Sequence, residues 1–418
     1  MKPRRLVSNK RRRLGMLLEN KNVVLGITGG IAAFKAAEIA SQLRKRGAHV
    51  KCIMTQHATE FITPLTMREI SGNPVAVSMF GDIPEFNVEH IALAQWADIF
   101  VIAPATANII GKIAGGIADD MLSTTVMATK APVLIAPAMN TNMYLNPIVQ
   151  DNIHKLEQYG YEFITPASGH LACGTTGIGR LPEPADIIDH IEWLACRTDV
   201  LKGKKVIVTA GGTREPIDPV RFIGNHSSGR MGFAIAKAAA FAGAEVTLVA
   251  GTTDHLKTPV GLARRIDVGS TRDMKEVVDS YYDTCDLVIK AAAVADYRSA
   301  HPAENKIKKS DETLTLPMTK NPDILFGLGQ RKKHQVLVGF AAETTHVLEY
   351  GAAKLKKKNL DMLVANDVSA EGAGFKGTTN IATFLFPDGS VEKLEKMGKD
   401  ELAALIVQRA AAILAKKS

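Results

Sequence analysis

Residues 205–251 constrain the fold of this chain more than any other stretch. A β-branched apolar run at 206–208 leads through the turn Gly211-Gly212 into a polar insertion and then an alanine-rich segment, and a second apolar run begins after Gly243. Strand, helix and strand in this order form a β-α-β unit, whose first loop lies at the carboxyl edge of a parallel sheet. Backbone N–H groups and a helix N-terminus at that edge bind phosphate groups, so we expect an anionic ligand there.

A second unit of this kind occupies residues 23–55. Its first apolar run ends in Thr28-Gly29-Gly30, and Gly47-Ala48 precedes its second run, as Gly243-Ala244 does in the later unit. Two such units in 418 residues predict an α/β protein with two doubly wound, Rossmann-like domains. Neither turn has the GxGxxG spacing of NAD-binding folds, which argues against a nicotinamide oxidoreductase. The simplest alternative is two generic α/β domains whose glycines only make tight turns.

The spacing of the two units also sets the expected domain limits. We expect a basic, disordered tail at 1–22, a first domain at 23–196 and a second domain at 197–418. Residues 1–13 hold seven Lys and Arg side chains and no acid, so they carry nearly all of the net charge of +8. A short basic tail is more often a disordered start than a binding element, so we predict no nucleic-acid partner.

The four cysteines are scattered, without a CxxC pair or the spacing of metal ligands. This pattern suits a reducing compartment and argues against both a disulfide framework and a structural zinc. No apolar run reaches the ~18–20 residues that a membrane-spanning helix needs. We therefore predict a cytoplasmic protein that does not contact a membrane.

Polar side chains follow two apolar runs of the first half. Thr106 comes shortly after the run 99–103, Asn140 comes shortly after the run 132–135, and a helix is predicted between them at 109–129. An amide at the carboxyl edge of a sheet suits a substrate carboxylate or amide. For Asn140 the alternative is a turn residue that caps the next helix.

Residues 168–180 (SGHLACGTTGIGR) form a glycine-rich loop that cannot belong to a core. Cys173 is therefore predicted to be exposed and mobile, which suits a reactive or proton-donating thiol on a flap. His90 falls near the start of a helix predicted at 89–98. A histidine there is usually only a polar surface residue, and spacing alone gives it no role.

Four motifs of the first half together resemble the flavin-dependent phosphopantothenoylcysteine decarboxylases. They are the TGGIAA turn at 28–33, His90, the PAMN segment at 137–140 and the ACGxxGxGR loop at 172–180. The resemblance implies an FMN-dependent reaction in which the substrate's cysteine carboxyl group leaves as CO₂. The FMN contacts that it implies are Gly29, Gly30, Thr55 and Thr106.

The same resemblance implies three catalytic residues. His90 would orient or deprotonate the substrate, Asn140 would bind its carboxylate, and Cys173 would donate a proton. The family commonly has Trp where this chain has Tyr144. Both are amphipathic aromatic residues, so we expect retained function with altered packing around the substrate.

The polar insertion of the second half is rich in anion-binding residue types. Arg221 offers a forked donor to carboxylate or phosphate, and Asn225 precedes Ser227-Ser228-Gly229, which suits a phosphate cradle at a helix start. The alternative is a structured surface loop. Lys306 opens a lysine cluster suited to a polyphosphate, although such a cluster is usually a solvated face.

Later residues of the second half suit a nucleotide. Asp296 follows a run of small residues and can accept a hydrogen bond from a base or ribose, and Phe340 can stack on a base. Lys354 and Lys358 lie four residues apart, hence on one face of a helix.

Five motifs between residues 202 and 390 closely resemble the phosphopantothenate–cysteine ligases: TAGGTxExIDPVRFIxNxSSGxMG, KAAAVADY, KIKK, KNPDI and GFAAET. The resemblance implies that CTP, with Mg²⁺ or Mn²⁺, activates the substrate as an acyl-cytidylate that cysteine then attacks. Asn225 and Arg221 would handle this intermediate, and Lys306 would steady phosphate charge. The implied nucleotide contacts are Ala291, Ala292, Asp296, Lys306, Asn321, Pro322, Asp323, Ile324, Phe340, Lys354 and Lys358. No metal ligand can be assigned from the sequence.

A decarboxylase followed by a ligase resembles the bifunctional enzymes of coenzyme A biosynthesis. The expected substrates are 4′-phosphopantothenate, cysteine and CTP, and the ligase product is the decarboxylase substrate. The resemblance also implies a homo-oligomer with trimeric decarboxylase and dimeric ligase domains. The alternative is a non-catalytic flavin-binding regulatory protein, against which the presence of both Asn140 and Cys173 argues.

Overall fold

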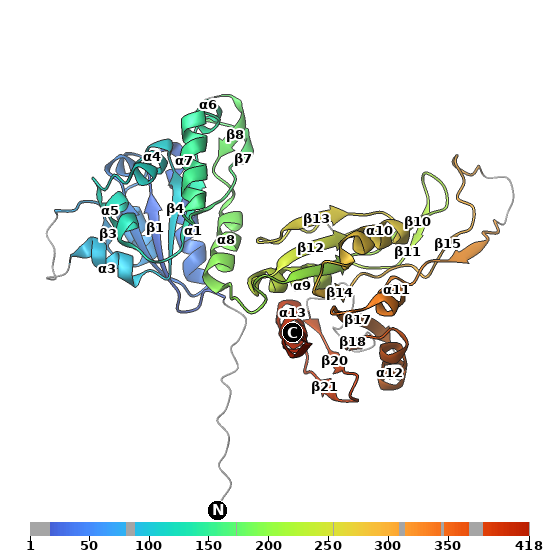
Figure 1. Cartoon of the computed structure of the whole chain (residues 1–418). Coiled ribbons are helices and arrows are strands. Elements are labelled where there is room, and N and C mark those ends of the chain that lie inside the picture. The colour runs from blue at the N-terminus through green and yellow to red at the C-terminus, as the bar shows by residue number, and fades with distance from the viewer. Residues whose placement is uncertain are drawn as a thin grey trace, which may run out of the picture. The chain divides into compact units, whose positions relative to one another are not determined.

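The computed structural model describes residues 17–80, 88–172, 174–253, 255–308, 314–343, 347–367 and 379–417. The chain divides into two compact units, Met1–Cys196 and Arg197–Ser418. Each unit is an α/β domain with helices packed on a mainly parallel sheet (Figure 1), so the predicted fold class is confirmed. Residues 17–22, which we assigned to the tail, pack onto the first domain: Leu18 is fully buried, and β1 already begins at Asn22.

The sheet of the first domain has six strands in the order β3-β2-β1-β4-β5-β6, and every pair is parallel. Chain order reverses between β1 and β4, and this switch point is where doubly wound sheets bind ligands. The strands are β1 (Asn22–Ile27), β2 (His49–Met54), β3 (Val75–Ala76), β4 (Ile99–Ala105), β5 (Val133–Pro137) and β6 (Glu162–Phe163).

Helices cover both faces of this sheet, because its central strands are apolar on both sides. Val23 and Leu25 pack against one group of helices and Val24 against the other. The first group is α1 (Lys35–Lys45), α2 (Pro64–Ser71) and α8 (Pro184–Cys196). The second is α3 (Glu89–Trp96), α4 (Ala107–Gly115), α5 (Met121–Ala128) and α7 (Pro147–Gln158). Three single turns, η1 (Ile31–Phe34), η2 (Gln56–Glu60) and α6 (Thr141–Tyr144), follow β1, β2 and β5.

Two local predictions in this domain were wrong. The helix predicted at 109–129 is two helices, α4 and α5, because Gly116 adopts a left-handed conformation (φ 71°) and Asp120 starts α5 with a capping box to Ser123. The glycine-rich segment 168–180 is not an open loop. It is an antiparallel hairpin of β7 (Ala167–His170) and β8 (Thr176–Arg180).

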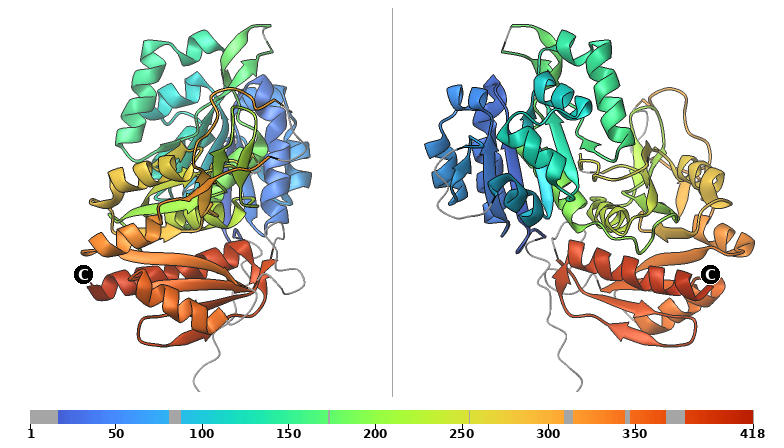
Figure 2. Two further views of the ribbon diagram at one scale, coloured as in Figure 1. Left: turned by 90° about the vertical axis from the view of Figure 1, so that its right-hand side faces the viewer. Right: turned by 60° about the vertical axis from the view of Figure 1, so that its left-hand side comes forward.

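The sheet of the second domain has eight strands in the order β13-β12-β9-β14-β17-β18-β20-β21 (Figures 1 and 2). The first six are parallel, and β20 and β21 add an antiparallel edge. Chain order reverses between β9 and β14. The bounds are β9 (Lys205–Ala210), β12 (Glu245–Ala250), β13 (Arg264–Asp267), β14 (Leu287–Lys290), β17 (Val336–Glu343), β18 (Met362–Asp367), β20 (Ala382–Leu385) and β21 (Val391–Lys393).

Helices again cover both faces. One face packs against α9 (Arg230–Phe241) and α13 (Lys399–Lys417), and the other against α10 (Thr271–Tyr282), α11 (Ile324–Arg331) and α12 (Val347–Lys357). Short antiparallel pairs complete the domain: β10 (Arg214–Pro216) with β11 (Phe222–Gly224), β15 (Tyr297–Ser299) with β16 (Met318–Lys320), and β19 (Thr379–Asn380) with β22 (Met397–Gly398). In Figure 1 the β10–β11 hairpin and β15 extend away from the large sheet.

Candidate active sites

The predicted flavin residues follow three neighbouring strands of the first domain. Gly29 and Gly30 come after β1, Thr55 after β2, and Thr106 after β4. Thr28 joins the loops on either side of the switch point, because its hydroxyl donates to Pro104 O at 2.7 Å and accepts from the Thr106 N–H at 3.1 Å. The structure therefore brings all four predicted residues to one edge of the sheet.

Three helical turns begin at this edge. The Thr55 hydroxyl accepts from the Ala58 N–H at the start of η2, and the Thr106 hydroxyl accepts from the Ile109 N–H at the start of α4. Gly30 precedes η1 and provides no side chain to cap it. Hydroxyl groups and first-turn N–H groups are donors that suit a flavin phosphate, so the residues present fit such a cofactor.

Asn140 follows β5 at the same edge. Its side-chain oxygen accepts from the Asn142 N–H at 2.9 Å and so caps α6, which is the alternative role that we considered. The β7–β8 hairpin lies against this loop, since the Met139 N–H donates to Gly179 O at 2.9 Å. Cys173, between the two hairpin strands, lies outside the described residues.

The remaining decarboxylase residues lie on helices. His90 is half-buried in the first turn of α3, and α3 leads into β4. Because such a helix runs antiparallel to the strands, its first turn lies toward the carboxyl edge of the sheet. Tyr144 ends α6 and packs, partly buried, against the hydrophobic core of this domain.

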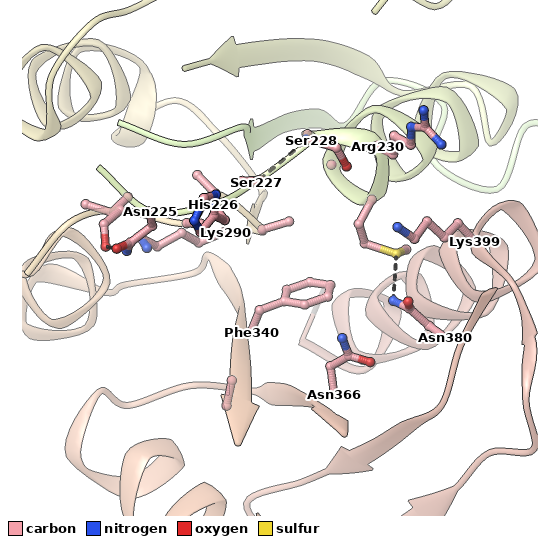
Figure 3. Close-up of a pocket in the computed structure, with 18 of the residues that line it drawn as sticks. Asn225, His226, Ser227, Ser228, Arg230, Lys290, Phe340, Asn366, Asn380 and Lys399 are labelled. Carbon is pink, nitrogen blue, oxygen red and sulfur yellow. Dashed lines mark hydrogen bonds between the residues drawn. The ribbon is translucent and has the colours of Figure 1, made fainter. Parts of the chain in front are cut away.

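A pocket of about 540 Å³ lies at the carboxyl edge of the second sheet (Figure 3). It is lined by the loop and helix start that follow β9, by the loop that follows β14, and by residues of β17 and β18. Its lining residues are Asn225, His226, Ser227, Ser228, Gly229, Arg230, Met231, Gly232, Lys290, Ala291, Ala292, Ala293, Val294, Asp296, Phe340, Ala341, Asn366, Asn380 and Lys399. Figure 3 shows Asn225, His226 and Lys290 on one side of Phe340, and Asn380 and Lys399 on the other.

The N-terminus of α9 opens into this pocket. Gly232 allows α9 to start directly against β9, because a Cβ at this position would lie 2.4 Å from the Cβ of Ala210. Gly229, at the N-cap, has φ 76° and makes no side-chain cap. The first-turn N–H groups of a twelve-residue helix are thus presented at the switch point, which suits a phosphate.

Asn225 connects the two sides of the switch point. Its side-chain N–H donates to Val294 O at 3.0 Å, so the loop after β9 is held to the loop after β14. Gly212 makes isolated bridges to both Thr252 and Ala293, which strengthens the same junction. The amide nitrogen of Asn225 carries a second N–H, which can donate to a ligand oxygen in the pocket.

Five of the predicted ligase residues line the pocket: Asn225, Ala291, Ala292, Asp296 and Phe340. The other predicted nucleotide residues lie outside its lining. Asn321 donates to Thr271 Oγ1 and Ala295 O, and the Ile324 side chain is 2% exposed in the core. Asp323 forms an ion pair of 2.8 Å with Lys358.

Arg221 and Lys306 meet through a separate loop. The Arg221 guanidinium donates to Ile307 O at 2.7 Å and lies 3.6 Å from Asp218. Asp218 is buried and accepts from the N–H groups of Val220 and Arg221 at 2.8 Å and of Ile307 at 3.2 Å. Asp218 therefore holds the segments of both predicted residues together.

Replacing Asp218 with Asn should loosen this loop in a pH-dependent way. Burial raises the pKa of Asp218, but the three N–H bonds and Arg221 outweigh burial and bring the pKa below its usual value. The ionised carboxylate therefore stabilises the fold above the unfolded pKa of about 4, and this contribution is lost as pH falls through the lower folded pKa. The unfolding temperature of D218N should be lower than that of the parent protein at pH 6, and the two temperatures should converge toward pH 3. A difference that is constant over this range would contradict the assignment.

The sequence reasoning missed several pocket residues. Asn366 and Asn380 each have a buried side-chain oxygen without a hydrogen-bond partner in the described part of the chain, and the Asn380 N–H lies 3.8 Å from Met231 Sδ. Burial lowers the pKa of Lys399, and Arg230 lowers it further. Lys290 also lines the pocket; it opens the KAAAVADY motif, which assigns it no role of its own.

Comparison with known proteins identifies the family. The Flavoprotein family matches residues 12–195, and the DNA/pantothenate metabolism flavoprotein C-terminal domain matches residues 201–414. The coenzyme A biosynthesis bifunctional protein CoaBC of Bacillus subtilis (strain 168) is 50% identical over 95% of this chain and 98% of its own length. This chain belongs to the CoaBC family.

Another curated CoaBC protein matches this chain over a similar share of its length. That of Escherichia coli (strain K12) is 44% identical over 92% of this chain and 96% of its own length. A solved C-terminal domain of a CoaBC protein is 42% identical, covers 52% of this chain and all of that domain, and has a TM-score of 0.46. Because curated CoaBC proteins match more than nine tenths of this chain and of their own length, the chain is a bifunctional enzyme of coenzyme A biosynthesis with a flavoprotein domain, as the motifs predicted. Within the described residues, no helix is long and apolar enough to span a membrane.

Proposed function

We propose that this chain makes 4′-phosphopantetheine in two steps. The second domain joins 4′-phosphopantothenate to cysteine with CTP, and the first domain removes CO₂ from the product with FMN. The main support is the pocket of about 540 Å³ at the switch point of the second sheet, where an uncapped helix start, an amide and an aromatic ring meet. A phosphate chain, an acyl group and a base are the ligand parts that these three features suit.

In the ligation, the carboxylate of 4′-phosphopantothenate attacks the α-phosphorus of CTP and pyrophosphate leaves. The cysteine amine then attacks the acyl carbon, loses a proton and displaces CMP. The N–H groups at the start of α9 would donate to phosphate oxygens. Asn225, held beside Val294 by one side-chain N–H, would donate its other side-chain N–H to the acyl oxygen or carboxylate. Arg221 and Lys306 would bring positive charge to the same intermediate from the Asp218 loop.

Mg²⁺ would enter with the nucleotide. Among the described residues, no group of three His, Cys, Asp or Glu side chains is placed to hold a metal ion. Mg²⁺ usually keeps several waters and takes further ligands from substrate phosphates. We therefore propose that oxygens of the CTP triphosphate supply most of the Mg²⁺ ligands other than water.

In the decarboxylation, bound FMN would supply a two-electron oxidation of the substrate that makes loss of CO₂ possible, and would return the two electrons after CO₂ has left. Gly29, Gly30, Thr55 and Thr106 would bind it at the switch point of the first sheet. Asn140 would bind the carboxylate that leaves, while His90 would orient the substrate. Cys173 would return the proton that completes 4′-phosphopantetheine.

The proposed assembly and location rest on the resemblance to the bifunctional enzymes of coenzyme A biosynthesis. We propose a cytoplasmic homo-oligomer in which decarboxylase domains form trimers and ligase domains form dimers. Native mass spectrometry should then show a mass that is a multiple of both two and three chains. A stable monomer with full activity would contradict this arrangement.

Nucleotide products test the ligase chemistry. With 4′-phosphopantothenate, CTP and Mg²⁺ but no cysteine, we expect an acyl-cytidylate and pyrophosphate, and addition of cysteine should release CMP. EDTA added at the start should stop formation of the acyl-cytidylate, and with it the later release of CMP. Formation of CDP and phosphate would instead indicate an acyl phosphate, and preference for ATP would contradict the assignment of CTP. Flavin released by heat should have the mass of FMN rather than riboflavin or FAD.

A further inference from the structure

Lys290 is the residue of the ligase pocket whose position the proposed function leaves unexplained. It ends β14, which lies at the centre of the sheet beside the switch point, and its half-buried side chain lines the pocket near Asn225 (Figure 3). Within the described parts of the chain, the side-chain amine of Lys290 makes no hydrogen bond and no ion pair. The other lysines of this region differ: Lys358, for example, is paired with Asp323 at 2.8 Å.

The charges around Lys290 come from several elements. Two lysines approach from the last turn of α12 and from the residue that follows this helix, namely Lys354 and Lys358. Asp323 approaches from the start of α11, and Asp296 from the loop after β14. His226 lines the pocket from the loop before α9, and Arg230 and Lys399 line it further along. Asp323 is already paired with Lys358, which leaves Asp296 to offset the charge of Lys290.

These surroundings disfavour the charged form of Lys290 while the pocket holds no ligand. Burial lowers the pKa of Lys290 most, and the charge of Lys358 lowers it further. Asp323 and Asp296 raise the pKa, while Lys354 lowers it again. The resulting pKa of Lys290 is about 8. A partly buried ammonium group without a partner is unfavourable, and buried polar groups in native proteins are nearly always paired. A ligand that supplies an anion would complete the site.

A phosphate group is the anion that this position suits. Lys290 lies at the carboxyl edge of the sheet, in the same pocket as the first-turn N–H groups of α9, and these N–H groups favour phosphate. Lysine binds phosphate oxygens as a point charge and does not need the planar, two-point geometry of an arginine–carboxylate pair. A purely structural lysine would be expected to have its partner within the fold.

We propose that Lys290 binds a phosphate group of the nucleotide and takes up a proton when it does so. The inference rests on the proposed binding of CTP in this pocket and adds a residue to it. Because the proton is taken up on binding, the affinity for CTP should depend on pH through Lys290, which binding of a nucleotide alone would not require.

Calorimetry of the whole protein tests this proposal. CTP with Mg²⁺ is titrated at fixed pH in two buffers with different ionisation enthalpies, and the dependence of the heat on the buffer gives the number of protons taken up. For a group with a pKa near 8 in the free protein and well above 9 in the complex, uptake is about a quarter of a proton at pH 7.5 and about three quarters at pH 8.5. K290R keeps the charge but cannot release the proton. Subtracting the proton uptake of K290R from that of the parent protein therefore removes the contribution of CTP's own ionisation.

The variants separate charge from proton uptake. K290R should bind CTP without the extra uptake, and K290M should bind about tenfold more weakly, also without it. K356M removes an exposed lysine from α12 and should behave like the parent protein. K290M should unfold at the same temperature as the parent protein or higher, because it removes an unpaired charge.

Three results would overturn the proposal. K290R could take up as many protons as the parent protein, or K290M could bind CTP with unchanged affinity. Alternatively, uptake could accompany 4′-phosphopantothenate or cytidine rather than CTP, which would place Lys290 on a different ligand group. If the parent protein bound no CTP at all, the proposed function of the pocket would itself be wrong. If it bound CTP but took up no more protons than K290R, only the role of Lys290 would be contradicted.

Discussion

Replacing Gly179 with Ala is expected to abolish decarboxylation while ligation continues. Gly179 has φ 134°, and a Cβ at this position would lie 2.2 Å from Met139 O, far inside any real contact. The Gly179 carbonyl also accepts from the Met139 N–H at 2.9 Å, so the hairpin cannot move away without losing this bond. The β7–β8 hairpin, which carries Cys173, would therefore lose its position against the Asn140 loop.

The two activities of G179A can be measured separately. We expect kcat/KM for 4′-phosphopantothenoylcysteine to fall at least ~100-fold, since misplacement by about 1 Å can cost that much. Formation of CMP by the ligase should change less than about twofold, because its pocket lies in the other domain. G160A is the matched control: Gly160 also has a positive φ (86°), but a Cβ there would meet nothing within 4 Å. Equal losses in G179A and G160A would show that backbone strain alone explains the effect.

Replacing Asn225 with Asp is expected to produce the opposite pattern. The two side chains have nearly the same shape, but Asp cannot donate to Val294 O, which lies 3.0 Å from the present N–H. A carboxylate oxygen would instead face that carbonyl oxygen and repel it, so the loops after β9 and β14 would separate. The new negative charge would also oppose the phosphates and the acyl group that we place in the pocket.

Ligation by N225D should fall at least ~100-fold, in the range measured for removal of one well-placed donor. Decarboxylation of supplied 4′-phosphopantothenoylcysteine should be unchanged. N359D is the control, because the Asn359 side chain also donates to a backbone carbonyl, that of Gly329, at 3.0 Å and lies outside the pocket lining. Retention of ligase activity by N225D, or an equal loss in N359D, would remove Asn225 from the proposed mechanism.

The parallel sheets, and the edge of each sheet that carries the candidate residues, could be predicted from the sequence. The apolar runs around Val24 and Ile207 are buried on both sides, and such runs separated by a helical stretch require a parallel sheet. Residues that follow those strands, such as Thr106 and Asn225, must then lie at one edge. The family motifs added roles that spacing alone did not supply.

Features that depend on tertiary packing were harder to predict. Lys290 ends an apolar strand, and nothing local shows that its amine lines a pocket or that it has no partner among the residues that the structure describes. Asn380 and Lys399 reach the pocket from distant parts of the chain, from β19 and from the start of α13. The break between α4 and α5 is different, because Gly116 and the Asp120 capping box are visible in the sequence and were overlooked.

The most direct measurement of the central claim is a single incubation followed by mass spectrometry. Purified protein with bound flavin is mixed with 4′-phosphopantothenate, cysteine, CTP and Mg²⁺, and products are sampled over time. We predict transient 4′-phosphopantothenoylcysteine followed by 4′-phosphopantetheine, with one CMP for each molecule formed. Absence of both products while the protein holds its flavin and its fold would contradict the assignment of two consecutive activities to this chain.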